Sequence, residues 1–276
     1  MNRIPFSVSM CVYGKNNPEH FRTAVESILH QTVKPDEIVL VVDGPVPDEL
    51  NLVISAYEQQ PVFNVIRLAE NQGHGNARRM GLSKCSYELV ALMDADDISV
   101  DNRFELQLAA FQDHPDVSVI GGNITEFSND PTNIVGMRSV PQSDTEIKRY
   151  MKTRCPMNQI TVMFRKQDVE AVGGYIDWYC EEDYYLWLRL MQAGYMFLNI
   201  DSALCHVRVG EEMYKRRGGW KYFKSEAKLQ KYMIDNQIIP WTTYVNNVLK
   251  RLVVQVLLPN TIRGWVFKTF ARENVI

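Results

Sequence analysis

The first half of the chain alternates between short apolar segments and segments whose apolar residues recur at helical spacing. The apolar segments are 6–13, 37–44, 62–68 and 88–93, and the helix-like segments between them are 18–30, 48–59 and 75–84. Short apolar runs are typical of buried strands. Strands that alternate with helices predict an α/β fold, with a mostly parallel sheet flanked by helices on both faces. Right-handed crossovers bring the carboxyl ends of such strands to one edge, where open α/β sheets bind ligands.

The fourth of these strands ends abruptly in carboxylates. The run 89–93 is entirely apolar, and Asp94, Asp96 and Asp97 follow it directly. Carboxylates this close repel one another unless a cation offsets their charge, and hard oxygen ligands suit Mg²⁺ or Mn²⁺. A lone Asp-x-Asp is at least as often a solvated acidic turn. Its position at the carboxyl edge of the sheet is what favours a metal site here.

Polar residues that follow the other three strands should face the same crevice. Tyr13 follows the first strand, Asp43 ends the second, and the loop 71–78 follows the third. Asp43 is a candidate acceptor for the imide N–H of a uracil or thymine ring, and Arg78 is a candidate contact to the base or the diphosphate. The loop is punctuated by glycines that permit close backbone approach to a ligand, although most such loops are ordinary turns.

Composition excludes several other classes of protein. The 276 residues are 46% hydrophobic, which is enough for a full core, and the net charge of −3 does not favour binding to nucleic acid. The five cysteines lie far apart without a C-x-x-C pair, which argues against a zinc site or a disulfide framework and fits a reducing, cytoplasmic environment. We expect no signal peptide, and no apolar run reaches the roughly 20 residues of a membrane-spanning helix.

The regular alternation ends near residue 215. We therefore predict a catalytic domain over 1–215 and a helical extension over 216–276. The extension has a wide apolar face that is flanked by Lys250 and Arg251; the face comprises Val245, Val248, Leu249, Leu252, Val253, Val256 and Leu257. Basic amphipathic helices with aromatic residues can lie at the inner face of the cytoplasmic membrane, but they can equally pack on the catalytic domain or form a homodimer contact.

Five motifs resemble, in order, those of family 2 glycosyltransferases. They are 8–13 with the following 24–32, then 35–44, Asn71-x-Gly73-x-Gly75-Asn76-Ala77-Arg78, Asp94-Ala95-Asp96-Asp97 and Glu182-Asp183-Tyr184-Tyr185-Leu186-Trp187-Leu188-Arg189. The resemblance covers roughly residues 6 to 210. It is nearest to bacterial exopolysaccharide and capsule transferases, some of which carry an Arg-Arg-Gly-Gly like the one that begins at Arg216. One departure is Val42, where many members have an Asp before the acid that corresponds to Asp43.

The resemblance implies a Rossmann-like GT-A fold and a nucleotide-sugar donor, most simply a UDP-sugar. It also implies a Mn²⁺ or Mg²⁺ ion, inversion at the anomeric carbon, and a saccharide or lipid-linked saccharide acceptor in cell-surface polysaccharide synthesis. The residues assigned to the donor are Cys11, Tyr13, Asp43, Asn71, Arg78, Asp94, Asp96, Arg216 and Arg217, and those assigned to the metal are Asp96, Asp97 and His206. From sequence alone, a hydrogen-bonded core histidine is the commoner interpretation of His206, and a solvated basic loop is as common for the arginine pair.

Asp183 is the candidate general base. It lies in the first turn of a predicted helix, 182–193, that is followed by Gly194. The positive end of the helix dipole favours an ionised carboxylate, ready to accept a proton from the acceptor hydroxyl, and such catalysis typically contributes about 10²–10⁴-fold. Acids at helix N-termini are often only caps, so the resemblance decides for catalysis. Glu181 and Glu182 are the alternatives.

Two other functions remain open. A sugar nucleotidyltransferase should carry a Gly-Gly-x-Gly-x-Arg loop after the first strand, and residues 12–16 do not supply it. A nucleotide-sugar-binding assembly protein without catalysis is disfavoured by the intact Asp96 and Asp183. A dinucleotide-dependent oxidoreductase is disfavoured because no G-x-G-x-x-G follows the first strand.

Overall fold

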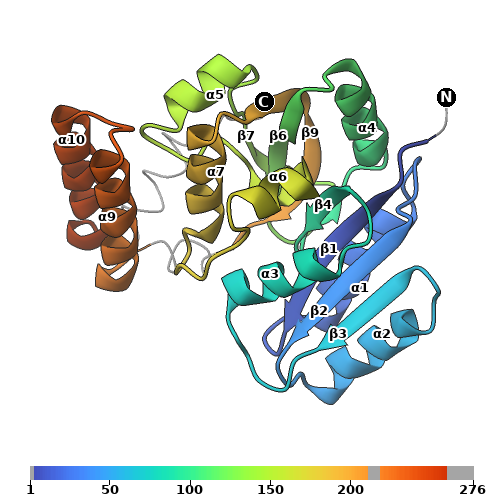
Figure 1. Cartoon of the computed structure of the whole chain (residues 1–276). Coiled ribbons are helices and arrows are strands. Elements are labelled where there is room, and N and C mark those ends of the chain that lie inside the picture. Colours follow the sequence, from blue (N-terminus) through green and yellow to red (C-terminus); the bar gives the residue numbers. More distant parts are fainter. Residues whose placement is uncertain (1–2, 211–217, 260–276) are drawn as a thin grey trace.

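A nine-stranded mixed sheet, in which β7 pairs only with β6, organises the molecule (Figure 1). The computed structural model describes residues 3–210 and 218–259. The strand order is β3-β2-β1-β4-β8-β6-β9-β5. Helices cover both faces of the sheet, and a pair of helices lies beside it at one end of the molecule (Figure 1).

The first half of the sheet is parallel, as predicted. Its strands are β1 (Phe6–Tyr13), β2 (Glu37–Asp43), β3 (Phe63–Arg67) and β4 (Leu89–Met93), and its helices are α1 (Pro18–Leu29), α2 (Asp48–Glu58) and α3 (His74–Lys84). Each predicted boundary lies within one residue of the observed one. β1 pairs in parallel with both β2 and β4, and the register places Tyr13 beside Asp43 at the end of both strands.

The second half of the sheet adds antiparallel pairs, which the alternation pattern did not indicate. Its strands are β5 (Ile98–Ser99), β6 (Val117–Phe127), β7 (Ile134–Arg138), β8 (Met163–Arg165) and β9 (Met196–Arg208). β8 runs antiparallel to β4 and β6, whereas β9 runs parallel to β6. The helices are α4 (Arg103–Asp113), α5 (Asp144–Tyr150), α6 (Lys166–Ala171) and α7 (Glu182–Gln192), with a 3₁₀ turn, η1 (Gln159–Thr161).

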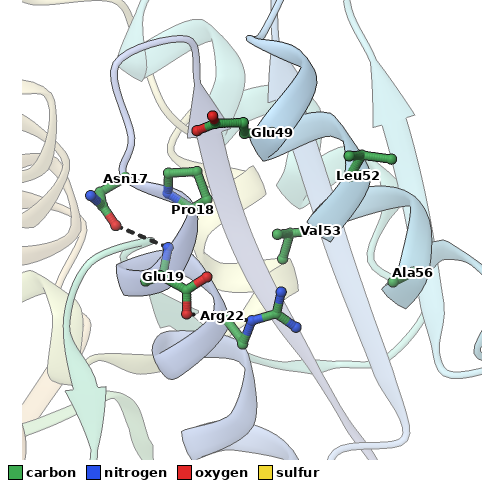
Figure 2. Close-up of a pocket in the computed structure, with 8 residues that line it drawn as sticks. All are labelled: Asn17, Pro18, Glu19, Arg22, Glu49, Leu52, Val53 and Ala56. Atoms are coloured by element: carbon green, nitrogen blue, oxygen red, sulfur yellow. Dashed lines mark hydrogen bonds and ion pairs between the residues drawn. The ribbon is translucent and has the colours of Figure 1, made fainter.

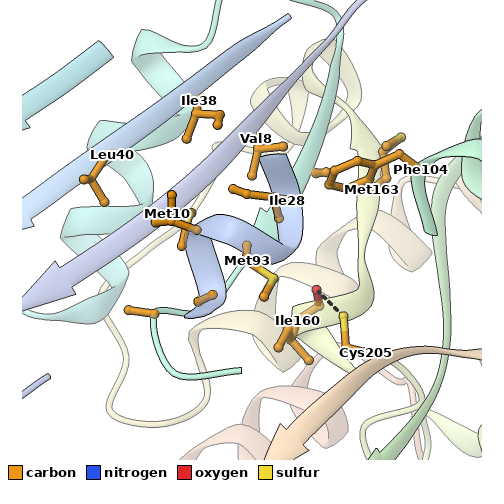
Figure 3. Close-up of a cluster of buried hydrophobic side chains, with 14 of the residues drawn as sticks. Val8, Met10, Ile28, Ile38, Leu40, Met93, Phe104, Ile160, Met163 and Cys205 are labelled. Atoms are coloured by element: carbon orange, nitrogen blue, oxygen red, sulfur yellow. Dashed lines mark hydrogen bonds between the residues drawn. The ribbon is translucent and has the colours of Figure 1, made fainter. Parts of the chain in front are cut away.

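Alternate residues of the central strands point into two separate cores. Figure 3 shows part of the first, in which Met10 and Leu40 of the sheet meet Ile28 of α1 and Phe104 of α4. The second core lies on the opposite face and contains Trp187 of α7. Because both faces are covered, β2 and β4 carry no polar alternation and appear in the sequence as continuous apolar runs, and the polar residues Ser7 and Ser9 of β1 are buried as well.

A C-terminal helical hairpin packs on the second core. Its helices are α9 (Trp220–Asp235) and α10 (Trp241–Leu252), and α10 continues as one π-helical segment, Val253–Leu257. Leu229 and Met233 of α9 are fully buried in the same cluster as α7, so this part of the predicted extension packs on the catalytic core. The domain boundary predicted near residue 215 stays a prediction, because it lies outside the described residues. Within 3–210 and 218–259, no helix has the length and apolar character needed to cross a membrane.

Candidate functional site

The carboxyl ends of β1, β2 and β4 bring most of the predicted site residues together. Cys11 lies near the end of β1, where Arg78, Asp94 and Asp43 all act on its thiol. Burial raises the pKa of Cys11 to about 12, so this thiol stays neutral and is a packing residue of the crevice wall rather than a charged contact. Tyr13, the last residue of β1, is 38% exposed and is available to a ligand.

Asp43 holds the loop that follows β3. Its Oδ1 accepts the N–H of Gln72 (2.7 Å), and its Oδ2 accepts the N–H of Gly73 (3.2 Å) and the Asn71 amide (2.9 Å). The Asn71 amide nitrogen also donates to the main-chain oxygen of Asp43 (3.1 Å). The amide oxygen of Asn71 can then accept from a ligand. The neighbouring Gly44 has φ +84°, and a Cβ there would lie 2.5 Å from the Asn71 nitrogen, so only glycine fits.

A chain of polar side chains links the end of β4 to the start of α7. The buried Arg78 donates from Nη2 to Asp94 (2.7 Å) and from Nε to His74 Nε2 (3.1 Å), and His74 Nδ1 lies 2.7 Å from Glu182 Oε1. His74 therefore accepts at Nε2 and donates at Nδ1. The sequence presented His74 simply as a loop residue, but it begins α3, and its spacing of four from Arg78 places both side chains on one face of that helix.

Gln159 connects this chain to the candidate base. Its amide lies 3.3 Å from Asp183 Oδ2 and 3.2 Å from Arg78 Nε, and it bridges the two when its nitrogen faces the carboxylate. Sequence reasoning missed Gln159, which comes from the short turn η1, and no motif in the sequence marks it. The second oxygen of Asp183 accepts the N–H of Tyr184 (2.6 Å).

The pKa of Asp183 is shifted in the direction opposite to the effect of the helix dipole. Burial, and then the charge of Glu182, raise the pKa of Asp183 to about 6, although the Tyr184 N–H, Arg78 and His74 act in the opposite direction. Desolvation outweighs the dipole here because the dipole is worth at most about 1 kcal/mol at an exposed site, whereas burial can move a pKa by several units. A carboxylate with a pKa of about 6 is ionised at neutral pH and is well matched to general-base catalysis.

The two acids beside Asp183 have other environments. Burial alone would raise the pKa of Glu182, but the hydrogen bond from His74 and the charges of His74 and Arg78 lower it below its usual value. Glu181 faces the C-terminal hairpin, where burial and then the charges of Glu226 and Asp183 raise its pKa well above the usual range. Glu182 is thus hydrogen-bonded to His74, and Glu181 lies beside Glu226 and Arg251 of the C-terminal hairpin. Both observations favour Asp183 as the base.

The acids after β4 suit a divalent cation. Burial, and then the charges of Asp96 and Asp94, raise the pKa of Asp97 well above its usual value, so negative charge is in excess here. Among the described residues, no three His, Cys, Asp or Glu side chains form a ready-made cage. Mg²⁺ is commonly bound by one or two carboxylates together with substrate phosphates, and the donor set fits that mode.

Two of the predicted metal ligands already have partners in the fold. Asp97 is 5% exposed and accepts the main-chain N–H of Arg208 (2.7 Å). His206 lies in β9, and its Nδ1 is 2.5 Å from the Thr125 hydroxyl, as expected for the hydrogen-bonded alternative. Burial lowers the pKa of His206, which keeps the ring neutral. A metal role for His206 stays a prediction, as do the roles of Arg216 and Arg217, which lie outside the described residues.

A hollow on the surface of the described residues lies away from the predicted site. One hollow of about 460 Å³ lies between α1 and α2 (Figure 2), and none of its lining residues belongs to the predicted site. It is bordered by the ion pair of Glu19 and Arg22 and by Leu52, Val53 and Ala56. The site at the carboxyl edge of the sheet is identified by its chemistry and by the convergence of its residues.

The sheet, the acids after β4 and the acid at the start of α7 together define the class of protein, a glycosyltransferase with a GT-A fold. Over residues 7–172 the chain matches the family model described as glycosyl transferase family 2, and it belongs to that family.

Similar proteins agree with this assignment. An Escherichia coli protein named UDP-Gal:alpha-D-GlcNAc-diphosphoundecaprenol beta-1,3-galactosyltransferase is 37% identical over 97% of this chain and 97% of its own length. The amylovoran biosynthesis glycosyltransferase AmsE of Erwinia amylovora is 38% identical over 81% of this chain and 84% of its own length. The structure of the mannosyltransferase PcManGT from Pyrobaculum calidifontis, in complex with GDP-Man and Mn²⁺, has a TM-score of 0.64 at 15% identity, over 95% of this chain and 72% of that chain.

Proposed function

We propose that this enzyme transfers a sugar from a UDP-sugar to a hydroxyl of a lipid-linked saccharide, with inversion at the anomeric carbon. The product would be an intermediate of a cell-surface polysaccharide, made at the inner face of the cytoplasmic membrane. The arrangement that carries the proposal is the row Asp94–Arg78–Gln159–Asp183, because, with the Gln159 nitrogen facing Asp183, it connects the donor side of the site to a base with a pKa of about 6. The E. coli relative, whose name specifies UDP-Gal and a diphosphoundecaprenol acceptor, supports the substrate classes.

The residues on the donor side would bind and orient the nucleotide-sugar. Asp43 holds the loop 71–73 in place, with Tyr13 exposed beside it. The buried Arg78 lies against Asp94, where its charge can also act on a diphosphate. A divalent cation held by Asp96 with Asp94 or Asp97 would supply Lewis-acid stabilisation of the leaving diphosphate.

Asp183 would activate the acceptor. Its carboxylate takes the proton of the acceptor hydroxyl as that oxygen forms a bond to the anomeric carbon and the bond from that carbon to the diphosphate oxygen breaks. Attack from the side opposite the leaving group inverts the configuration. Gln159 would hold the carboxylate in place, and Arg78, through the same amide, would keep the base and the donor at a fixed separation.

A direct assay tests this proposal. Purified enzyme would be incubated with a panel of UDP-, GDP- and dTDP-sugars, a synthetic GlcNAc-diphosphate-lipid and Mn²⁺ or Mg²⁺, and the anomeric configuration of the product would be read by NMR. We expect one UDP-sugar to be transferred with inversion. Binding of UDP-sugars without transfer or hydrolysis would instead favour the inactive assembly protein, and retention of configuration would contradict the roles given to Asp183.

The metal is tested in the same assay. Asp96→Ala should abolish transfer and weaken UDP-sugar binding in Mn²⁺, because it removes a charge that a cation bridging to the diphosphate requires. Asp113→Asn, an exposed acid of α4, is the control and should leave both unchanged. Full activity in excess chelator would show that no metal is needed.

A further inference from the structure

The last helical segment of the described chain, α10 with its π-helical continuation, turns its polar face toward the rest of the protein and its apolar face outward. Asn247 and Gln255 of the α10 segment are buried, at 5% and 4% exposure. The Asn247 amide donates to the main-chain oxygen of Lys152 (3.0 Å) and to Gln230 (2.8 Å). Between them, Arg251 pairs with Glu226 of α9 (3.0 Å). The spacing of four from 247 to 251 to 255 places these side chains along one inward face.

The apolar residues of the same segment point outward. Leu249, Val253 and Leu257 are 53%, 45% and 65% exposed, again at a spacing of four, and Trp241 at the start of the helix is 65% exposed. We call these four residues the outer stripe. Trp220, the first residue of α9, is 58% exposed. It lies near the C-terminal end of the α10 segment, because the N–H of the preceding Gly219 donates to the main-chain oxygen of Gln255 (2.8 Å). A row of large apolar side chains facing water indicates an interaction surface.

The sequence around the outer stripe is basic and lacks acids. From residue 236 to residue 272 there is no Asp or Glu, whereas a stretch of this length would contain about four at the average content of the chain. Five Lys and Arg residues occur in it, and Lys250 is exposed beside Leu249. Apolar and aromatic side chains together with lysine and arginine, without acids, are complementary to the interface of an anionic lipid membrane.

The hairpin also lies next to the catalytic helix. Glu226 and Arg251 both act on Glu181, which is two residues before Asp183. The Ser225 hydroxyl donates to the main-chain oxygen of Tyr179 (2.6 Å), and Trp178 donates to the main-chain oxygen of Ser225 (3.4 Å). A surface that the outer stripe binds would therefore lie on the acceptor side of the site. Figure 1 shows α10 at the edge of the molecule, beyond α9 and away from the parallel half of the sheet.

We propose that the outer stripe inserts into the headgroup–acyl boundary of an anionic membrane, with α10 lying along the surface. The base end of α7 is thereby held beside acceptors that are anchored in that membrane. This inference rests on the proposed lipid-linked acceptor for its purpose, but the binding itself is measured without any sugar substrate.

Vesicle flotation tests the proposal. The full chain would be mixed with vesicles of phosphatidylcholine alone or with 40% phosphatidylglycerol, at low and high salt. We expect binding to the anionic vesicles that weakens with salt, because the attraction of Lys and Arg to lipid headgroups is screened. The triple variant Leu249→Asn, Val253→Asn, Leu257→Asn should lose binding at least tenfold. Leu52→Asn, which changes a leucine that is 71% exposed on α2, is the matched control and should bind as the wild type does.

Two further measurements, UDP binding and turnover of the acceptor, separate a failure of this proposal from a failure of the proposed function. The triple variant should bind UDP normally and should turn over a short-chain, water-soluble acceptor at the wild-type rate, while losing activity on the same acceptor in vesicles. The proposal would be overturned if the wild-type protein did not bind anionic vesicles, even if it transferred sugar. It would also be overturned by a dimer that the triple variant converts to monomer without vesicle binding, or by vesicle binding that appears only after removal of residues 260–276.

Discussion

Three consecutive acids at the start of α7 differ in protonation because each faces a different partner. Glu182 accepts from His74, Glu181 faces Glu226, and Asp183 is desolvated beside Gln159. The sequence predicted Asp183 as the base, since the acidic motif resembles that of a known family. It did not indicate the raised pKa, because burial depends on side chains from η1 and α3 that are distant in the chain. Gln159 could not be predicted for the same reason.

The charge of Glu182 sets part of the pH dependence. It raises the pKa of Asp183, so Glu182→Gln should lower that pKa below about 6 and move the acid limb of the kcat profile to lower pH. The glutamine oxygen can still accept from His74. The measurement is a pH–rate profile from about pH 4.5 to 8, with the exposed Glu49→Gln as control. An acid limb that stays in place or moves to higher pH would show that Asp183 is not the titrating base.

At the scale of elements, the sequence predicted the parallel strands well and the later ones poorly. β1, β2 and β4 are short, mostly apolar runs bounded by turns and separated by helix-like segments, so their length and their flanking residues reveal them. β5 and β8 have only two and three residues, too few for any periodicity. Their pairing with β9 and β4 comes from tertiary contacts, which explains the antiparallel half that the alternation did not indicate.

The junction of β2 with the loop after β3 is testable through Asp43. Asp43→Asn would turn one carboxylate oxygen into an N–H group that faces backbone donors, and it removes charge-assisted hydrogen bonds worth about 1.5–3 kcal/mol each. We expect UDP binding, measured calorimetrically, to weaken about tenfold or more. The exposed Asp48→Asn at the start of α2 is the control.

Hydrogen exchange separates loop positioning from direct contact with the base. If Asp43 acts by holding the loop, the amides of Gln72 and Gly73 should exchange faster in Asp43→Asn than in the wild type without any ligand. Unchanged exchange together with weaker UDP binding would mean that Asp43 contacts the nucleotide and that its hydrogen bonds to the loop matter little.

At the scale of the whole molecule, the sequence showed an apolar face on the C-terminal helices but not the direction in which it points. Packing on the core and membrane contact were predicted with equal weight. α9 packs inward through Leu229 and Met233, whereas α10 turns Asn247 and Gln255 inward. Periodicity reports that a helix is amphipathic, and only the partners decide which face is buried. Here the partners are polar groups such as Gln230 and Glu226.

The largely buried pair of Arg251 and Glu226 joins the two helices of this hairpin, and Arg251 Nη2 also donates to the main-chain oxygen of Thr153 in the catalytic core (3.0 Å). Arg251→Gln would leave Glu226 and Glu181 together without a cation, and breaking a buried pair from one side typically costs about 3–5 kcal/mol. Urea unfolding at pH 7 should show a loss of this order. The double variant Arg251→Gln, Glu226→Gln should recover most of it, because no unpaired charge is then buried. Equal stability of the single variant and the wild type would show that the hairpin is not coupled to the core through these residues.

The central claim, that Asp183 is the base of an inverting sugar transfer, is tested most directly by Asp183→Asn. The pKa of Asp183 is about 6 in the folded protein, against 3.8 for an ordinary aspartate. Ionisation of Asp183 therefore lowers the stability of the folded protein as the pH rises from about 4 to above 6. The variant should therefore be at least as stable as the wild type at pH 8. The measurement is kcat with the acceptor alongside the Kd for UDP-sugar. We predict a nearly unchanged Kd and a kcat lower by about 10²–10⁴-fold, whereas a kcat within a few-fold of the wild type would contradict the claim.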